Sequence, residues 1–122
     1  MQIQKKSLSD KFSLFHDHWN PRVVAQLNGQ SVKLVKFQGE FVWHQHETED
    51  ELFLVVKGYF NMELRDQTIR INEGEFIVIP RGTEHRPVAP EEVQVLLFEP
   101  DTTLNTGDAA TSELTRNQLN SI

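Results

Sequence analysis

The chain contains no cysteine, so neither a disulfide framework nor a thiolate metal site can form. It also lacks any run of eighteen apolar residues, the length that a membrane-spanning helix needs. The opening stretch MQIQKKSLSDKF has two lysines but no apolar core and no small-residue cleavage site, so no signal peptide is predicted. Together these absences predict a cytoplasmic protein.

Basic residues are also scarce, with 12 lysines and arginines against 18 aspartates and glutamates and a net charge of −6. No basic stripe stands out, which argues against binding to nucleic acid or to an anionic membrane and favours a small-molecule ligand or a protein partner. A chain of 122 residues with 38% apolar and 25% charged residues is typical of one globular domain with a real core.

Three regions are predicted along the chain. Residues 1–21 form an N-terminal extension, in which Ser9 is expected to cap a short helix over 10–15. Residues 22–100 carry the strands of the domain. Residues 101–122 form a polar tail that is expected either to make one or two weak helical turns or to be disordered.

The central region predicts an all-β fold. Asn28-Gly29 separates RVVAQL from SVKLVKF, and this dipeptide supplies the positive φ angles that a tight hairpin turn requires. Turn signals then recur at short intervals, the last of them at 87–90. Many short strands at this spacing indicate a sandwich or barrel. The predicted later strands are FVWHQH, ELFLVV, YFNMEL, TIRI, EFIVIP and VQVLLFE.

Two of these runs, LFLVV and FIVI, are apolar on both faces. Strands of this kind are typically covered on both sides. One cover would be the interior of the domain, and the other would be a second layer or a partner subunit.

The stretch WHQHETEDE predicts a metal site. His44 and His46 are two residues apart, so on a strand both side chains leave the same face. If the acidic residues 47–50 form a turn, Glu51 opens the next strand and can face the two histidines. His85 follows a Pro-x-Gly corner that can aim its side chain inward.

Three imidazoles and one carboxylate are good ligands for a first-row divalent metal, and octahedral geometry leaves two positions for water and substrate. Three histidines with an open position also suit zinc. Two other interpretations stay open: the four residues are polar groups near surface turns, or the site binds metal without catalysing a reaction.

The order and spacing of these residues resemble the cupin superfamily. The first cupin motif is matched by Gly39, His44, His46, Glu51 and Gly58, and the second by Gly74, Pro80, Gly82 and His85. Two positions depart from the pattern: Gly39 lies one residue closer to the first histidine than usual, and Ala89 stands where an asparagine is expected. Neither position is a metal ligand.

The resemblance, which covers residues 30–100, implies a double-stranded β-helix or jelly-roll cupin barrel with the metal inside. It implies one divalent ion (Zn, Ni, Mn or Fe) held by His44, His46, Glu51 and His85, and a homodimer. The function expected is metal-dependent isomerase-type chemistry on a small sugar-like or keto-enol substrate. The alternatives are an Fe(II) dioxygenase and a non-catalytic small-molecule binding module.

Strand parity predicts which side chains face the interior. The predicted pocket lining is Val42, Phe53, Val55, Phe60 and Met62, with Trp43 facing outward. No further acid or base is predicted inside. The charged residues around His85, which are Arg81, Glu84 and Arg86, are expected at the rim. The second His-x-His pair, His16 and His18, is expected in a loop.

Overall fold

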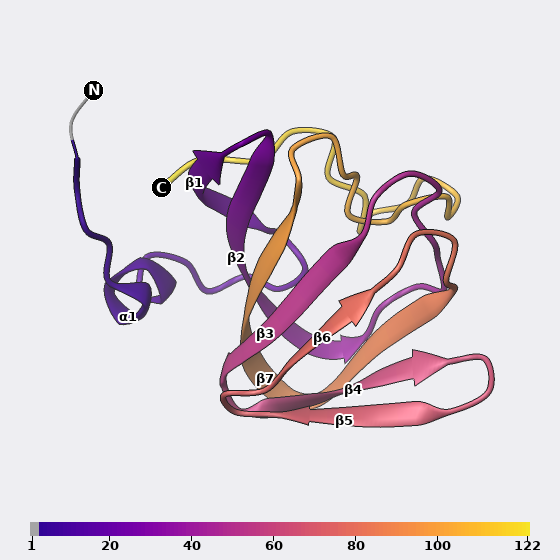
Figure 1. Ribbon diagram of the computed structural model, residues 1–122. Helices are drawn as coiled ribbons and strands as arrows, with labels where there is room; N and C mark the ends of the chain where they lie inside the picture. The colour runs from indigo at the N-terminus through magenta and orange to yellow at the C-terminus, as the bar shows by residue number, and fades with distance from the viewer. Residues whose placement is uncertain (1–2) are drawn as a thin grey trace.

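The computed structural model describes residues 3–122, and it confirms an all-β fold with one short helix (Figure 1). All strand pairs are antiparallel, and the strand order is β1-β2-β7-β3-β6, with the β4–β5 hairpin joined through β4 to β7. The elements are α1 (Leu8–Phe12), β1 (Arg22–Leu27), β2 (Gln30–Glu40), β3 (Glu51–Lys57), β4 (Tyr59–Leu64), β5 (Thr68–Asn72), β6 (Phe76–Ile79) and β7 (His85–Pro100).

The long strand β7 connects the sheet. β2 pairs with both halves of it on one side, while on the other side β3 pairs with its second half and β4 with its first half. The turn predicted at 87–90 is therefore wrong, because the chain stays extended there. Pro90 is accommodated at a bulge, where Phe37 pairs with Val93 but Gly39 pairs with Ala89, whereas Pro87 stays in register with Met62 of β4.

The predicted hairpin around Asn28-Gly29 is confirmed. Asn28 has a φ of 52° and Gly29 a φ of 74°, as a primed turn between β1 and β2 requires. The strand predicted for FVWHQH is not formed. Within residues 41–50, only His44 makes a β-type contact, an isolated antiparallel bridge to His85.

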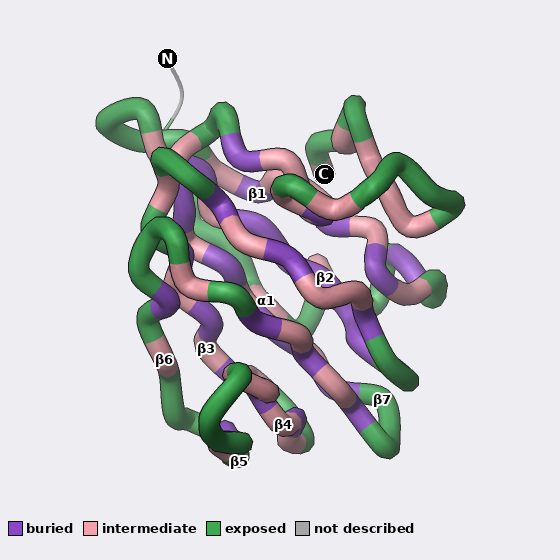
Figure 2. The backbone as a smooth tube through the Cα atoms, turned by 90° about the vertical axis from the view of Figure 1, so that its right-hand side faces the viewer, coloured by how far each residue is buried: buried purple, intermediate pink, exposed green. Residues whose placement is uncertain are grey.

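The interior is filled by alternate residues of the strands, and Figure 2 shows the resulting alternation of buried and half-buried positions along β3 and β7. In β2, residues 33–37 are all buried, so this stretch is covered on both faces. Phe60, Met62, Val93 and Val95 are fully buried at the centre. These side chains make a continuous apolar core below the predicted metal ligands.

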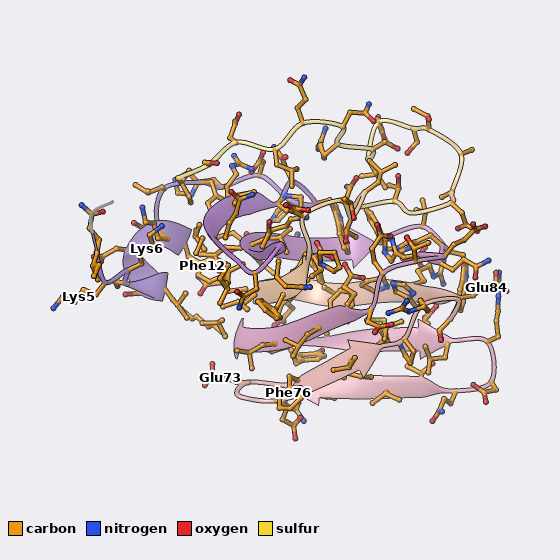
Figure 3. All side chains as sticks on the ribbon, turned by 45° about the horizontal axis from the view of Figure 1, so that its top comes forward. Lys5, Lys6, Phe12, Glu73, Phe76 and Glu84 are labelled. Atoms are coloured by element: carbon orange, nitrogen blue, oxygen red, sulfur yellow. The ribbon has the colours of Figure 1, made fainter. Side chains whose placement is uncertain are left out.

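The N-terminal extension packs on the outside of the sheet. Its helix begins one residue before the predicted cap, since the Ser7 side chain accepts a hydrogen bond from the Asp10 amide. Phe12, which Figure 3 labels on the helix, and Phe15 form a second buried cluster with Val24 and Leu34. This cluster covers part of the outer sheet face.

No segment among residues 3–122 covers the outer face of β6. The Phe76 side chain is 64% exposed and Val78 is 49% exposed, and Phe76 projects away from the ribbon in Figure 3. The expectation that FIVI is covered on both sides therefore does not hold for the isolated chain.

The segment after β7 is ordered and irregular, with turns but no helix. In Figure 1 it passes over the end of the sheet near the 41–50 loop and finishes beside β1. Thr106 is fully buried, and Ser121 bridges to Val23. Across residues 3–122, no helix is both long enough and apolar enough to span a membrane.

Candidate metal centre

The four predicted ligands come from three segments that meet at one end of the core. Glu51 is the first residue of β3 and points inward, in phase with Phe53 and Val55. His44 and His85 are joined by two backbone hydrogen bonds, His44 N to His85 O at 3.1 Å and His85 N to His44 O at 2.9 Å. This bridge replaces the predicted strand and still directs both imidazoles into the interior.

One donor atom from each of these residues lies within 4.8 Å of the others, and all four side chains are buried. Glu51 Oε1 lies 3.4 Å from the Nε2 atoms of both His46 and His85. Those three atoms are buried without a hydrogen-bond partner. Buried polar atoms almost always have a hydrogen-bond partner. Three such atoms that lack one and converge on one point fit a bound cation, to which each would offer a lone pair.

Two of the three imidazole rings are held in an orientation suited to metal binding. His44 Nδ1 lies 2.9 Å from the Val42 carbonyl oxygen, and His85 Nδ1 lies 2.9 Å from that of Thr83. A ring that donates from Nδ1 to a backbone carbonyl presents an unprotonated Nε2, the tautomer of a ligating histidine.

The surroundings of the cluster favour the protonation states that metal binding requires. Burial, together with the neighbouring His85, lowers the pKa of His44 to about 4, so this ring is neutral at pH 7. Burial alone would raise the pKa of Glu51, but polar contacts with Glu99, His46 and His85 hold it well below its usual range. Neutral imidazoles and an ionised carboxylate are the forms that bind a divalent metal.

A buried charged pair lies behind the cluster and was not predicted from the sequence. Lys33 Nζ lies 3.0 Å from Glu99 Oε1, and the two side chains are only 3% and 2% exposed. Pairing of Leu52 with Phe98 puts Glu99 on β7 next to Glu51 on β3. Burial and the charge of Glu51 raise the pKa of Glu99 well above its usual range.

Strand parity contains the signal that would have located this pair. Lys33 is in phase with the inward-facing Val35 and Phe37 of β2, and Glu99 is in phase with Val95 and Leu97 of β7. The alternation of each strand therefore places one charged residue at an interior position.

A small cavity with a volume of about 30 Å³ lies beside His44 and Glu51. Its wall is almost entirely apolar, and the only other polar side chain is that of Asn105. The remaining lining residues are Trp19, Pro21, Val35, Phe37, Phe41, Phe53, Pro87 and Leu97.

Of the predicted pocket lining, Phe53 borders this cavity. Val55, Phe60 and Met62 lie in the buried core and do not border it, and Val42 is half-buried against the same core. The aromatic residues that do border it, Trp19 among them, come partly from loops whose position parity does not predict.

The segment after β7 closes the cluster from above. Asp108 Oδ1 accepts a hydrogen bond from the Gln45 amide at 2.8 Å, and the Asp108 amide donates to the Gln45 carbonyl at 3.1 Å. Gly107 packs so tightly here that an added Cβ would collide with that carbonyl oxygen and touch the His44 ring. This segment thus forms a roof over the cluster.

The rim charges predicted near His85 pair with other surface residues. Arg81 binds Asp50, Glu84 binds Arg65, and Arg86 binds Glu63. The second His-x-His pair stays in the loop before β1, as predicted, where His18 Nε2 lies 2.7 Å from Glu92 Oε2.

Comparison with known proteins agrees with this geometry. The cupin domain family (Cupin_2) matches residues 31–100. The chain is 36% identical over 64 residues to the uncharacterized protein YdbB of Bacillus subtilis (strain 168), a match that covers 52% of this chain and 57% of that relative.

Two solved structures are similar as well. A cupin-2 domain containing protein from Shewanella frigidimarina has a TM-score of 0.77 and 49% identity, with 78% of this chain and 93% of that one covered. KdgF from a Halomonas species has a TM-score of 0.57 and 33% identity, with 66% and 78% covered. With its antiparallel β fold and its buried cluster of three histidines and a glutamate, the chain belongs to the cupin family.

Proposed function

We propose that the protein is a metal-dependent enzyme that acts on a small oxygenated molecule by isomerase-type chemistry. One observation supports this proposal. Three buried polar atoms without a hydrogen-bond partner, on His46, Glu51 and His85, converge next to a cavity. A set of ligand atoms of this kind suits a divalent ion, and two members of the four-residue cluster, His44 and Glu51, border the cavity.

The chain's own residues would each have a defined role. His44, His46 and His85 would bind the ion as neutral imidazoles, and Glu51 would bind it as a carboxylate. The ion would supply Lewis acidity to a carbonyl and its neighbouring hydroxyl, favouring proton movement between adjacent carbons. The apolar wall would exclude water from the reacting atoms.

Two other functions have specific support. A dioxygenase that uses Fe(II) would employ the same four ligands, and an apolar cavity suits the apolar dioxygen molecule. A non-catalytic binding module is favoured by the cavity lining, in which Glu51 is the only acidic residue and no basic residue other than His44 occurs. The nature of the metal, whether Zn, Ni, Mn or Fe, separates redox from non-redox chemistry.

The test is elemental analysis of the purified, untagged protein. Wild type is expected to carry about one divalent ion per chain, and His46→Ala is expected to lose it, because one of four ligands is removed. His18→Ala is the matched control, since this histidine lies in a surface pair with Glu92 outside the cluster. Circular dichroism checks that each variant folds.

Each outcome has a clear consequence. Iron in the wild type directs the next assay to oxygen consumption, and zinc, nickel or manganese directs it to isomerisation without oxygen. Equal metal content in wild type and His46→Ala, or no metal in either after reloading, would refute the proposed site.

The predicted partners remain proposals: a small-molecule substrate or ligand, a homodimer, and neither nucleic acid nor a membrane. The exposed Phe76 and Val78 on the outer face of β6 support the dimer, since a second copy would cover them. The cytoplasmic location also remains a prediction from the sequence.

A further inference from the structure

The composition of the cavity restricts which molecule can bind inside it, beside His44 and Glu51. Apart from His44 and Glu51, the side chains that line it are aromatic, aliphatic or proline, with Asn105 as the only exception. Trp19 stacks on Phe37 and Phe41 with ring centroids 4.4 Å and 4.7 Å apart, so the aromatic wall is a packed unit.

Asn105 is not free to recognise a ligand. Its amide nitrogen donates to the Leu114 carbonyl at 2.8 Å, and its amide oxygen accepts from the Arg116 backbone at 2.9 Å. Both ends of the amide are thus engaged in holding the segment after β7. Hydroxyl groups of a ligand that do not bind the metal therefore have no side chain in the cavity with which to form a hydrogen bond.

We infer that the ligand of this cavity is a compact α-hydroxyketone or keto-enol whose body is apolar, and that polyhydroxylated sugars are excluded. The inference rests on the proposed function, because the metal would bind the carbonyl and its neighbouring hydroxyl. All other atoms of the ligand then lie against the apolar wall. A hydroxyl buried there without a partner is unfavourable, and its loss of water is not compensated.

The size of the cavity limits the ligand to a compact molecule. The cavity volume of about 30 Å³ accommodates about two water molecules. A ligand of four carbons therefore fits only after one wall moves. The lining residues of β2, β3 and β7 are fixed by ladder hydrogen bonds, and His44 by its bridge to His85, so any movement has to come from the other lining residues, which are Trp19, Pro21, Phe41 and Asn105.

A pair of matched probes tests the inference directly. 3-Hydroxybutan-2-one and erythrulose share a four-carbon chain with a ketone beside a hydroxyl, and erythrulose differs by two additional hydroxyl groups. Isothermal titration calorimetry is performed on the protein after its metal content has been measured. We expect 3-hydroxybutan-2-one to bind at least tenfold more tightly, since each unpaired buried hydroxyl weakens binding by about tenfold or more.

Two valine variants identify the cavity as the cause. Val35→Thr adds a hydroxyl to the cavity wall and is expected to reduce the preference for 3-hydroxybutan-2-one at least threefold. Val93→Thr adds the same hydroxyl in the buried core away from the cavity and is expected to leave the preference unchanged. If Val35→Thr fails to fold, Val35→Ala enlarges the cavity and reduces the wall movement that the ligand requires, so 3-hydroxybutan-2-one is expected to bind more tightly; unchanged binding would show that it does not occupy this cavity.

The outcomes separate this inference from the proposed function. Equal or tighter binding of erythrulose to the metal-loaded protein overturns the inference and leaves the metal site intact. Binding of neither probe to the loaded protein also overturns it. Failure to load metal is detected before any probe is added, and it refutes the proposed function itself.

Discussion

Replacement of Glu99 by leucine is expected to destabilise the protein strongly. The substitution removes the partner of Lys33, whose side chain is 3% exposed and whose ammonium lies 3.0 Å from the lost carboxylate oxygen. A buried ammonium without a partner cannot recover its hydration. Removing one member of a buried ion pair typically costs about 3–5 kcal/mol, a large share of the roughly 5–15 kcal/mol that stabilises a domain.

Two further variants distinguish the unpaired charge from simple loss of packing. Glu99→Gln retains an oxygen that can accept from Lys33 and an amide that can contact Glu51, so a loss of about 1 kcal/mol is expected. The double variant Lys33→Met/Glu99→Leu removes both charges and keeps comparable volume. It is expected to recover most of the stability that Glu99→Leu alone loses, because buried pairs are often replaceable by apolar residues.

The assay is urea unfolding of the metal-free protein at pH 7, with free energies compared only among variants that share one m-value. The expected coupling energy between positions 33 and 99 is at least about 2 kcal/mol. The argument is refuted if Glu99→Leu lies within about 1 kcal/mol of wild type. It is equally refuted if the double variant is no more stable than Glu99→Leu.

Three further predictions concern the roof, the histidines and the outer face. Gly107→Ala should release bound metal to a chelator at least several-fold faster than wild type, because the new methyl group lifts the roof from the Gln45 carbonyl; Gly74→Ala, with a positive φ but open space around it, should not. In the metal-free protein, His44 takes up a proton near pH 6.5 in the unfolded chain but only near pH 4 in the folded chain. The free energy of unfolding should therefore fall by up to about 3 kcal/mol as the pH drops from 6.5 to 4. Urea titrations of His44→Gln should lack that part of the pH dependence. Phe76→Glu should convert a dimer to a monomer in analytical ultracentrifugation, and an unchanged mass would exclude the β6 face as the interface.

Much of the fold follows from local chemistry that the sequence displays. Asn28-Gly29 specifies its turn because the required backbone angles are intrinsic to those residues. The convergence of the four candidate ligands could be predicted because their spacing along the chain reflects turns of fixed length. His44 faces inward although its strand is absent, since one bridge to His85 is sufficient to orient it.

Other features depend on contacts that the sequence does not display. The prolines near 87–90 indicate a turn by local preference, but the pairing of β7 with β2 and β4 keeps the chain extended. The segment 101–122 has no periodic pattern, and its position depends on distant partners such as Gln45. Lys33 was not expected inside because an isolated lysine is rarely buried, and its partner is distant in sequence.

The two tryptophans of the chain occupy very different surroundings. Trp19 stacks on Phe41, whose ring meets the His44 imidazole at 5.4 Å, whereas Trp43 lies beneath the Arg65 guanidinium at 3.9 Å. The chain therefore carries its own optical probe: Trp19 emission should respond when a transition metal fills the cluster or a ligand enters the cavity. In Trp43→Phe protein that emission is the sole indole signal, so loading and ligand entry can be followed in real time without an external label.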